Sequence, residues 1–170
     1  MDAIRYTLLA AGLLAASWTD WKLRKIPNRL TVPLAAAGVL LSLVAGGVSG
    51  LLGSLGGLAA GLCAGVVLWL LNIFRAGDAK LLAALGAMMG WRWLATCFAY
   101  GLVAGGAAGI LLLLVRGQLL QRMKRLWSYG KLLLFSRRFS PYQPEKESEG
   151  ELPFAPFLAV GGLLACLFPL

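Results

Sequence analysis

The sequence contains no histidine and few acidic residues, and both shortages limit its chemistry. Its 170 residues include 7 acidic residues against 16 basic ones, for a formal net charge of +9. Without imidazole, histidine metal centres, serine–histidine triads and histidine acid–base chemistry are excluded. The three cysteines are widely spaced in apolar surroundings and form no CxxC pair. We therefore expect them to pack in the interior, without a zinc site or a disulfide framework.

Charged residues of either sign are also scarce. They make up 14% of the chain, against about 25% in soluble domains, while 59% of the residues are hydrophobic. A soluble domain of this size needs more polar surface than this chain supplies. The composition therefore predicts an all-α, polytopic membrane protein, organised as a single membrane-embedded domain over residues 1–170.

Apolar segments of helical length occur six times along the chain. A helix that spans a bilayer needs about 20 mostly apolar residues. Five segments approach this length, whereas the fourth is shorter and rises only about 20 Å. The six predicted transmembrane helices are 3–19, 30–49, 51–74, 79–91, 93–115 and 153–170. Small residues at 15–17 loosely resemble a signal-peptide cleavage site, but the basic flank that follows opposes translocation, so we expect the first helix to remain.

Basic residues mark one side of the predicted bundle. They crowd the connections that follow the first, third and fifth predicted helices, whereas the connection at 46–50 carries no charge. Cytoplasmic loops of membrane proteins carry an excess of lysine and arginine. We therefore expect a multi-pass protein of the cell membrane with its N-terminus outside, and Arg92 is the exception to this charge pattern.

Residues 117–151 form the long connection before the last helix. Their first part places apolar side chains at helical spacing among many basic ones, which is typical of an amphipathic helix lying on anionic lipid at the cytoplasmic face. The second part has two prolines and four glutamates, which predict a flexible linker. Because the helix has such an apolar face, we expect the lipid bilayer as its partner and no nucleic acid.

Glycine recurs every fourth residue in two of the predicted helices. The two series are Gly53, Gly57, Gly61 and Gly65, and then Gly101, Gly105 and Gly109. Such residues form one smooth stripe on a helix, which lets helix backbones approach closely in lipid. Tight packing is our interpretation, and a groove for a substrate helix is the alternative. The sequence also allows a homo-oligomer without specifying one.

Two carboxylates, Asp20 and Asp78, lie in or beside the apolar segments, and the predicted topology places both at one membrane face. An ionisable residue inside a spanning segment costs about 2.5–3.5 kcal/mol, so a functional role is the first hypothesis. Two close carboxylates share a proton, and the pair can then activate water and polarise a peptide carbonyl without metal or cofactor. The alternative is that Asp20 pairs with Lys22 or Arg24, and Asp78 with Lys80, as interfacial anchors.

Four neighbouring residues are predicted to support this pair. Gly77 would let a substrate backbone approach closely. Pro27 interrupts the helical backbone, and Asn28 can cap the helix that follows. Lys80 either biases the pKa of the carboxylate pair or reaches lipid headgroups.

Three segments of the chain carry a family resemblance. Residues 20–31, DWKLRKIPNRLT, resemble the first-aspartate motif of the aspartic prepilin peptidases, and residues 76–86, AGDAKLLAALG, resemble their GxGD motif. Residues 152–161 are similar to the closing helix of that family. The resemblance implies a six-helix intramembrane aspartic endopeptidase with Asp20 and Asp78 as the catalytic pair. It also implies pilin-like, Tad-type, competence or archaeal flagellin precursors as substrates, cut behind their leaders at the cytoplasmic face.

Two departures from the family pattern bear on function. Arg75 stands where the GxGD motif has its first glycine. It favours the alternative function, a non-enzymatic membrane assembly component or small carrier that retains the fold. Larger family members carry a cysteine-rich domain and also methylate the new N-terminus. This chain has no paired cysteines, so the resemblance implies a peptidase without N-methyltransferase activity.

Overall fold

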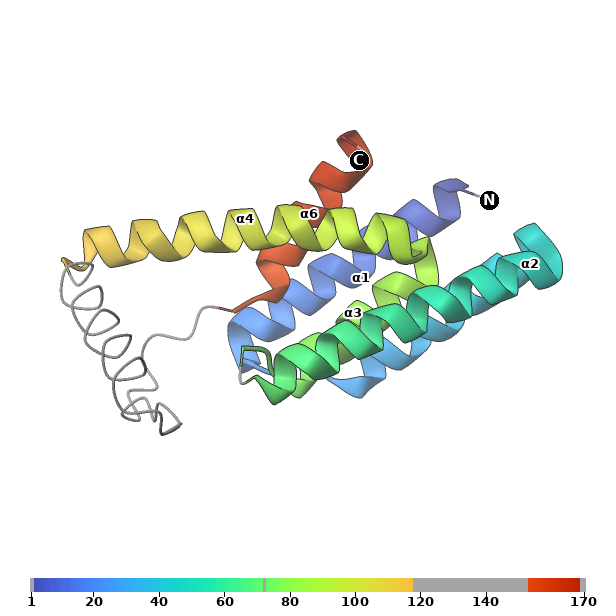
Figure 1. Cartoon of the computed structure of the whole chain (residues 1–170), viewed down its shortest axis with the longest axis horizontal. Coiled ribbons are helices and arrows are strands. Elements are labelled where there is room, and N and C mark those ends of the chain that lie inside the picture. The colour runs from blue at the N-terminus through green and yellow to red at the C-terminus, as the bar shows by residue number, and fades with distance from the viewer. Residues whose placement is uncertain (1, 72, 118–152, 169–170) are drawn as a thin grey trace, which may run out of the picture. The chain divides into compact units, whose positions relative to one another are not determined.

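A computed structural model of the chain describes residues 2–71, 73–117 and 153–168. Within these ranges the structure is all-helical, as predicted (Figure 1). The helices are α1 (Asp2–Leu23), α2 (Asn28–Leu70), α3 (Ala76–Met89), α4 (Trp91–Val115) and α6 (Ala155–Leu167). Residues 118–151 of the predicted amphipathic helix and linker lie outside the described residues.

Two of the described helices are long and apolar enough to cross a membrane. They are α2 and the Trp91–Leu112 part of α4, with mean hydropathies of 2.0 and 1.7, and α6 is a shorter apolar helix. Both fit insertion into a bilayer, because their lengths reach the roughly 20 residues that a span needs. The six-span topology stays a prediction.

Helix α2 reverses direction at Gly47, whose φ of 56° and ψ of −139° are not helical. Gly38 packs against Ala87 of α3. Gly57 packs against Gly86, which directly precedes Ala87 in the same helix. In an uninterrupted helix Gly38 and Gly57 would be about 28 Å apart. Both can therefore reach the same turn of α3 only if the chain folds back. The reversal falls in the uncharged connection predicted between the second and third helices.

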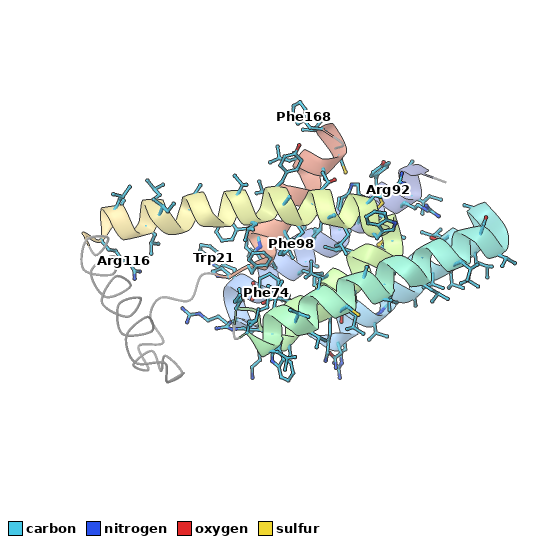
Figure 2. All side chains as sticks on the ribbon, in the orientation of Figure 1. Trp21, Phe74, Arg92, Phe98, Arg116 and Phe168 are labelled. Carbon is cyan, nitrogen blue, oxygen red and sulfur yellow. The ribbon has the colours of Figure 1, made fainter. Side chains whose placement is uncertain are left out.

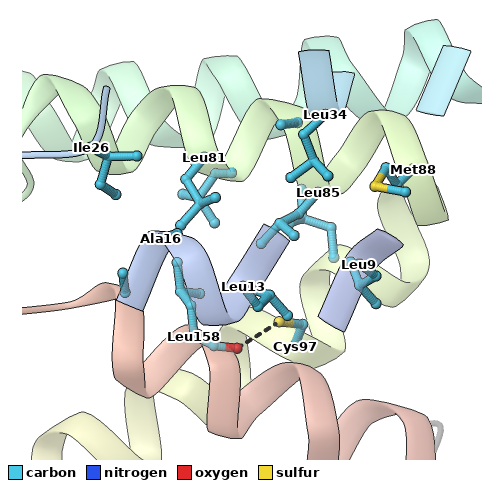
Figure 3. Close-up of a cluster of buried hydrophobic side chains, with 14 of the residues drawn as sticks. Leu9, Leu13, Ala16, Ile26, Leu34, Leu81, Leu85, Met88, Cys97 and Leu158 are labelled. Carbon is cyan, nitrogen blue, oxygen red and sulfur yellow. Dashed lines mark hydrogen bonds between the residues drawn. The ribbon is translucent and has the colours of Figure 1, made fainter. Parts of the chain in front are cut away.

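The short helix α3 is the most buried element of the described structure. Every residue from Leu81 to Met88 is buried, and Leu81, Leu82 and Leu85 are fully enclosed. Figure 3 shows part of this core: leucines of α1 and α2 lie beside those of α3, and Leu158 of α6 lies on the α1 side, near Leu13 and Cys97. A helix that is apolar on all sides is buried either in a protein core or in lipid, and α3 is covered by the neighbouring helices. The segment predicted as marginal is thus the centre of the bundle.

Glycines of α2 let its second half approach the α3 backbone. An added Cβ at Gly57 would strike the Gly86 carbonyl, and one at Gly61 would strike the Leu82 carbonyl. Gly65 meets Ala79 in the same way, whereas Gly53 faces open space. The packing interpretation is confirmed for these three positions. A Cβ added at Gly101 of α4 would lie 3.1 Å from the Phe157 carbonyl oxygen of α6, a less close approach.

The prediction for the cysteines is only partly correct. Cys97 is buried, and its thiol donates to the Leu158 carbonyl at 3.5 Å. Cys63 and Cys166 are exposed, so the prediction that they pack in the interior is wrong. They lie on apolar helix faces that no described residue covers, and hydropathy does not separate such faces from the core.

We expect Gly57→Ala to destabilise the protein and Gly56→Ala, its matched control, to leave stability unchanged or slightly improved. The Gly57 Cβ would overlap a backbone carbonyl that cannot rotate away, whereas nothing lies within 4 Å of a Cβ at Gly56. Overpacking of this kind costs about 1–3 kcal/mol. Thermal unfolding of the purified variants in one detergent measures the difference. Equal midpoints would contradict the backbone contact.

Candidate active site

Asp20 lies in the last turn of α1 and is only 3% exposed. Its Oδ2 accepts a hydrogen bond from the backbone N–H of Ala155 at 3.0 Å. Ala155 is the first residue of α6, and the first N–H groups of a helix have no partner within it. A carboxylate at this position also interacts favourably with the helix dipole. The carboxylate therefore joins the end of α1 to the start of α6.

Asp78 lies in the first turn of α3 and is 5% exposed. Its Oδ2 accepts the backbone N–H of Arg75 at 3.1 Å, three residues before it. This bond satisfies a donor at the helix N-terminus, as an acidic residue does at the third position of a capping box. The backbone bond fixes the carboxylate at the point where the chain enters α3.

The structure brings Asp20 and Asp78 together at one cavity of about 570 Å³. The cavity is formed by the end of α1, the connection to α2 and the start of α3. Figure 2 labels Trp21, which follows Asp20 in α1, and Phe74, which lies shortly before α3. Both are at the same end of the helices. The other lining residues are Leu23, Arg24, Lys25, Ile26, Arg75, Ala76 and Gly77.

The pKa of Asp78 is raised from 3.8 to about 6. Asp78 lies in the first turn of α3, outside the helices long enough to span a bilayer. Burial is the largest cause, because it removes water from the charged form. The Arg75 backbone bond opposes the rise, the nearby Asp20 charge adds to it, and the Arg75 guanidinium lowers the pKa. The pair is thus close enough for one charge to affect the other.

Arg75 ties the start of α3 to the connection between α1 and α2. Its Nη1 donates to the Arg24 carbonyl oxygen at 2.9 Å. Arg24 has a φ of 50°, in the left-handed region, where the chain turns out of α1. The side chain that replaces the motif glycine therefore bonds across the two segments that carry the carboxylates.

The predicted supporting residues lie at the site, but the capping role predicted for Asn28 is wrong, and the role of Gly77 toward a substrate stays a prediction. A Cβ at Gly77 would lie 3.2 Å from the Ile26 Cβ, so this glycine makes room for the α1–α2 connection. Pro27 holds the N-cap position of α2, as expected of a residue that interrupts the backbone. Asn28 is not the cap, because it is already inside the helix and its Oδ1 accepts the Lys80 ammonium at 2.8 Å.

Three phenylalanines pack together beside the cavity. The Phe74 ring lies 4.3 Å from that of Phe154 and 6.0 Å from that of Phe98, measured between centroids. These residues precede α3, precede α6 and lie in α4, respectively. Aromatic pairs at these separations contribute about 0.5–1.5 kcal/mol beyond the area they bury. The cluster holds the start of α6, and so the donor to Asp20, near the start of α3.

Comparison of the sequence with known proteins identifies its family. The sequence profile described as the type IV leader peptidase family matches residues 7–110, a range that includes both carboxylates. The chain belongs to the type IV leader peptidase family.

Individual relatives in this family agree with the profile. The chain is 34% identical over 166 residues to a prepilin leader peptidase/N-methyltransferase of Burkholderia pseudomallei, covering 94% of this chain and 45% of that protein. It is 31% identical over 172 residues to the protein of the same name from Aeromonas hydrophila, covering 95% and 48%. The chain thus spans about half the length of the curated relatives it matches. No solved structure matches it.

Sequence reasoning missed two contributors to the site. Ala155 supplies the donor to Asp20, and its place inside the third family-like segment was the available signal. Arg75 was considered only as a departure from the motif, although its backbone N–H bonds Asp78 and its side chain bonds Arg24. In the described part of the chain, no group of three potential metal-ligating side chains occurs.

Asp78→Asn is expected to stabilise the protein above pH 6 but not below pH 4. The folded-state pKa of about 6 exceeds the ordinary 3.8, so stability is highest with Asp78 protonated and falls as the pH rises between these values. The amide can still accept the Arg75 N–H, so the variant removes the ionisation cost alone, on the order of 2 kcal/mol. Unfolding of both proteins from pH 4 to pH 8 measures it. Parallel pH profiles would contradict the raised pKa.

Proposed function

We propose that this chain is an aspartic endopeptidase that removes leader peptides from type IV pilin-like precursors, with Asp20 and Asp78 as its catalytic pair. One observation carries the proposal: two buried carboxylates from separate segments lie at one cavity, where burial, together with the nearby Asp20 charge, raises the pKa of Asp78. Membership of the leader peptidase family supports the same reaction class. The relatives' printed names supply prepilin as the substrate.

The proposed chemistry needs one ionised and one protonated carboxyl group. The ionised group takes a proton from a water molecule, and the resulting hydroxide attacks the carbonyl carbon of the scissile peptide. The protonated group donates to the carbonyl oxygen as negative charge develops there. The tetrahedral intermediate then collapses, the C–N bond breaks, and the departing amine takes up a proton. The raised pKa of Asp78 supports this residue as the holder of the shared proton.

The cavity's surroundings support a location at the cytoplasmic membrane face. Arg24 and Lys25 line it, and Lys22 and Arg29 flank it in sequence, in the pattern that cytoplasmic connections show. We propose that the apolar helix of the precursor lies in the bilayer while its leader reaches the carboxylates. The protein would then be a multi-pass enzyme of the cell membrane.

We further propose that this chain cleaves precursors without methylating them. Its relatives carry both activities in their names, and the chain matches about half of each. The carboxylate cavity supports hydrolysis, which needs water as its only co-reactant. Intact mass measurement of a processed precursor distinguishes the two outcomes, because methylation adds one methyl group to the new N-terminus.

Replacement of either carboxylate is expected to reduce cleavage by about a hundredfold or more, as for loss of a general acid or base. The measurement follows the mass of a co-expressed pilin-like precursor with Asp20→Asn, Asp78→Asn and the parent. Asp2→Asn is the matched control, since it makes the same chemical change at the other end of α1, about 27 Å along the helix from Asp20. Undiminished cleavage by a folded Asp20 or Asp78 variant would refute the catalytic pair.

The alternative function, a non-enzymatic assembly component or small carrier, depends on Arg75 distorting the motif. The structure offers this residue a role compatible with catalysis, because its backbone N–H donates to the Asp78 carboxylate. Its guanidinium donates to the Arg24 carbonyl, which links the segments that carry the two carboxylates. The enzyme proposal is therefore the better supported of the two.

Arg75→Ala is expected to cleave the precursor within about thirtyfold of the parent rate, because the backbone donor to Asp78 is retained and a hydrogen bond from a charged donor is worth about 2 kcal/mol. Its pH profile should shift upward, since the Arg75 charge lowers the pKa of Asp78. Cleavage rates from pH 5 to pH 8 measure both effects. An unshifted profile would mean that the guanidinium does not act on the carboxylate pair.

A further inference from the structure

A second cavity, of about 400 Å³, lies at the opposite end of α3 from the carboxylates. We call the cavity lined by Asp20 and Asp78 the acid cavity. It touches α3 at Ala76–Asp78, whereas the second cavity touches α3 at Met88 and Met89, about 15–20 Å further along the helix. Figure 2 shows Arg92 at this end and Phe74 at the other. We call the second cavity the arginine cavity, because Arg5 and Arg92 both line it.

Arg5 reaches the arginine cavity with an unfilled hydrogen-bonding site. One terminal nitrogen donates to the Ser42 hydroxyl at 3.2 Å. The Nε atom is buried and has no partner among the residues that the structure describes. A buried charged donor without an acceptor is costly, and most such groups in folded proteins have one. Because Nε has almost no accessible surface, an acceptor that enters the cavity would reach the other nitrogens of this guanidinium, whose side chain is only partly buried.

A second positive group and a helix N-terminus face the same space. Arg92 stacks on the Trp91 ring, with its guanidinium carbon 5.6 Å from the ring centroid. Trp91 is the first residue of α4, and the N–H groups of a first helical turn have no helical partner and attract anions. Among the lining residues that the structure describes, none is an aspartate or a glutamate. These described lining side chains therefore supply positive charge without a carboxylate beside it.

We propose that the arginine cavity binds the phosphate group of an anionic phospholipid. Guanidinium groups offer paired donors that match phosphate oxygens. The surroundings suit acyl chains, because Val44, Val48 and Leu52 of α2 lie beside lining residues and are 64–71% exposed. Trp91, at 57% exposed, has the amphipathic ring typical of the membrane interface. Binding of an anionic headgroup would also explain why Arg92, the exception to the charge pattern of the loops, lies at this end of the bundle.

The first test compares lipid headgroups on the purified full-length chain. The chain is stripped of lipid in neutral detergent and titrated with phosphatidylglycerol or phosphatidylcholine of the same acyl chains. Native mass spectrometry then counts the bound lipid molecules. We expect one phosphatidylglycerol to bind about tenfold or more tightly than phosphatidylcholine, because only the former carries net negative charge. Equal affinities would overturn the proposal.

Variants locate the binding within the molecule. Arg5→Gln and Arg92→Gln should each weaken phosphatidylglycerol binding about tenfold, the loss expected for one charge-assisted hydrogen bond. Arg116→Gln is the matched control, because it removes the same charge from a residue that does not line the cavity. An equal loss with Arg116→Gln would show a diffuse charge effect and refute the site. If the glutamine variants do not fold, Arg5→Lys and Arg92→Lys serve instead, because they keep the positive charge but lose the paired N–H donors of the guanidinium. Unchanged phosphatidylglycerol binding by both lysine variants would refute the proposed phosphate site.

A third arm separates lipid from soluble phosphate. Inorganic phosphate, added at the concentrations used for the lipid, should not displace phosphatidylglycerol, because it lacks acyl chains to contact the exposed valines. Displacement at equal concentration would identify a soluble phosphate compound as the ligand and overturn the lipid assignment. None of these measurements uses peptide cleavage, so their outcome is independent of the proposed function.

Discussion

Backbone contact between α3 and the two halves of α2 is the constraint on which the rest of the structure depends. Helices in lipid gain little from hiding apolar side chains, so their association relies on close packing. Gly38, Gly57 and Gly61 provide it by removing the side chains that would hold the backbones apart. The buried Ser54 hydroxyl adds a bond of 2.6 Å to the Ala87 carbonyl. The short helix α3 is thereby held in place by both halves of α2, and each end of α3 lines one of the two cavities.

Bonds between residues far apart in the sequence then assemble the acid cavity around one end of this axis. The Asp20 carboxylate accepts a donor 135 residues away, and Arg75 reaches a carbonyl 51 residues away. A buried carboxylate needs such partners, because desolvation without hydrogen bonds is costly. The partners used here are mainly backbone groups at helix ends. These groups leave the charges of the two carboxylates close to one another, as shared-proton chemistry requires.

The sequence was sufficient to predict the helical segments and the meeting of Asp20 and Asp78, and insufficient for the roles of their neighbours. Apolar length identifies a helix, and the order of helices decides which ends share a side. Neither property says what covers a helix, so the central place of α3 could not be predicted from its marginal length. Asn28 shows the same limit: a residue suited to capping instead accepts Lys80, from a different helix. That choice depends on tertiary contact, which overrides local preference.

The two ends of α3 also differ in how charge is balanced. At the acid cavity, Arg24, Lys25 and Arg75 line the same space as two carboxylates, so charges of both signs come from the chain itself. At the arginine cavity, two guanidinium groups and the start of α4 meet, and the part of the chain that the structure describes supplies neither a carboxylate to the lining nor an acceptor to the buried Arg5 Nε. Charge in a poorly solvated site must be compensated by a nearby group. The first cavity can therefore remain open to water and a peptide, whereas the second is complete only when an anion from the surroundings occupies it.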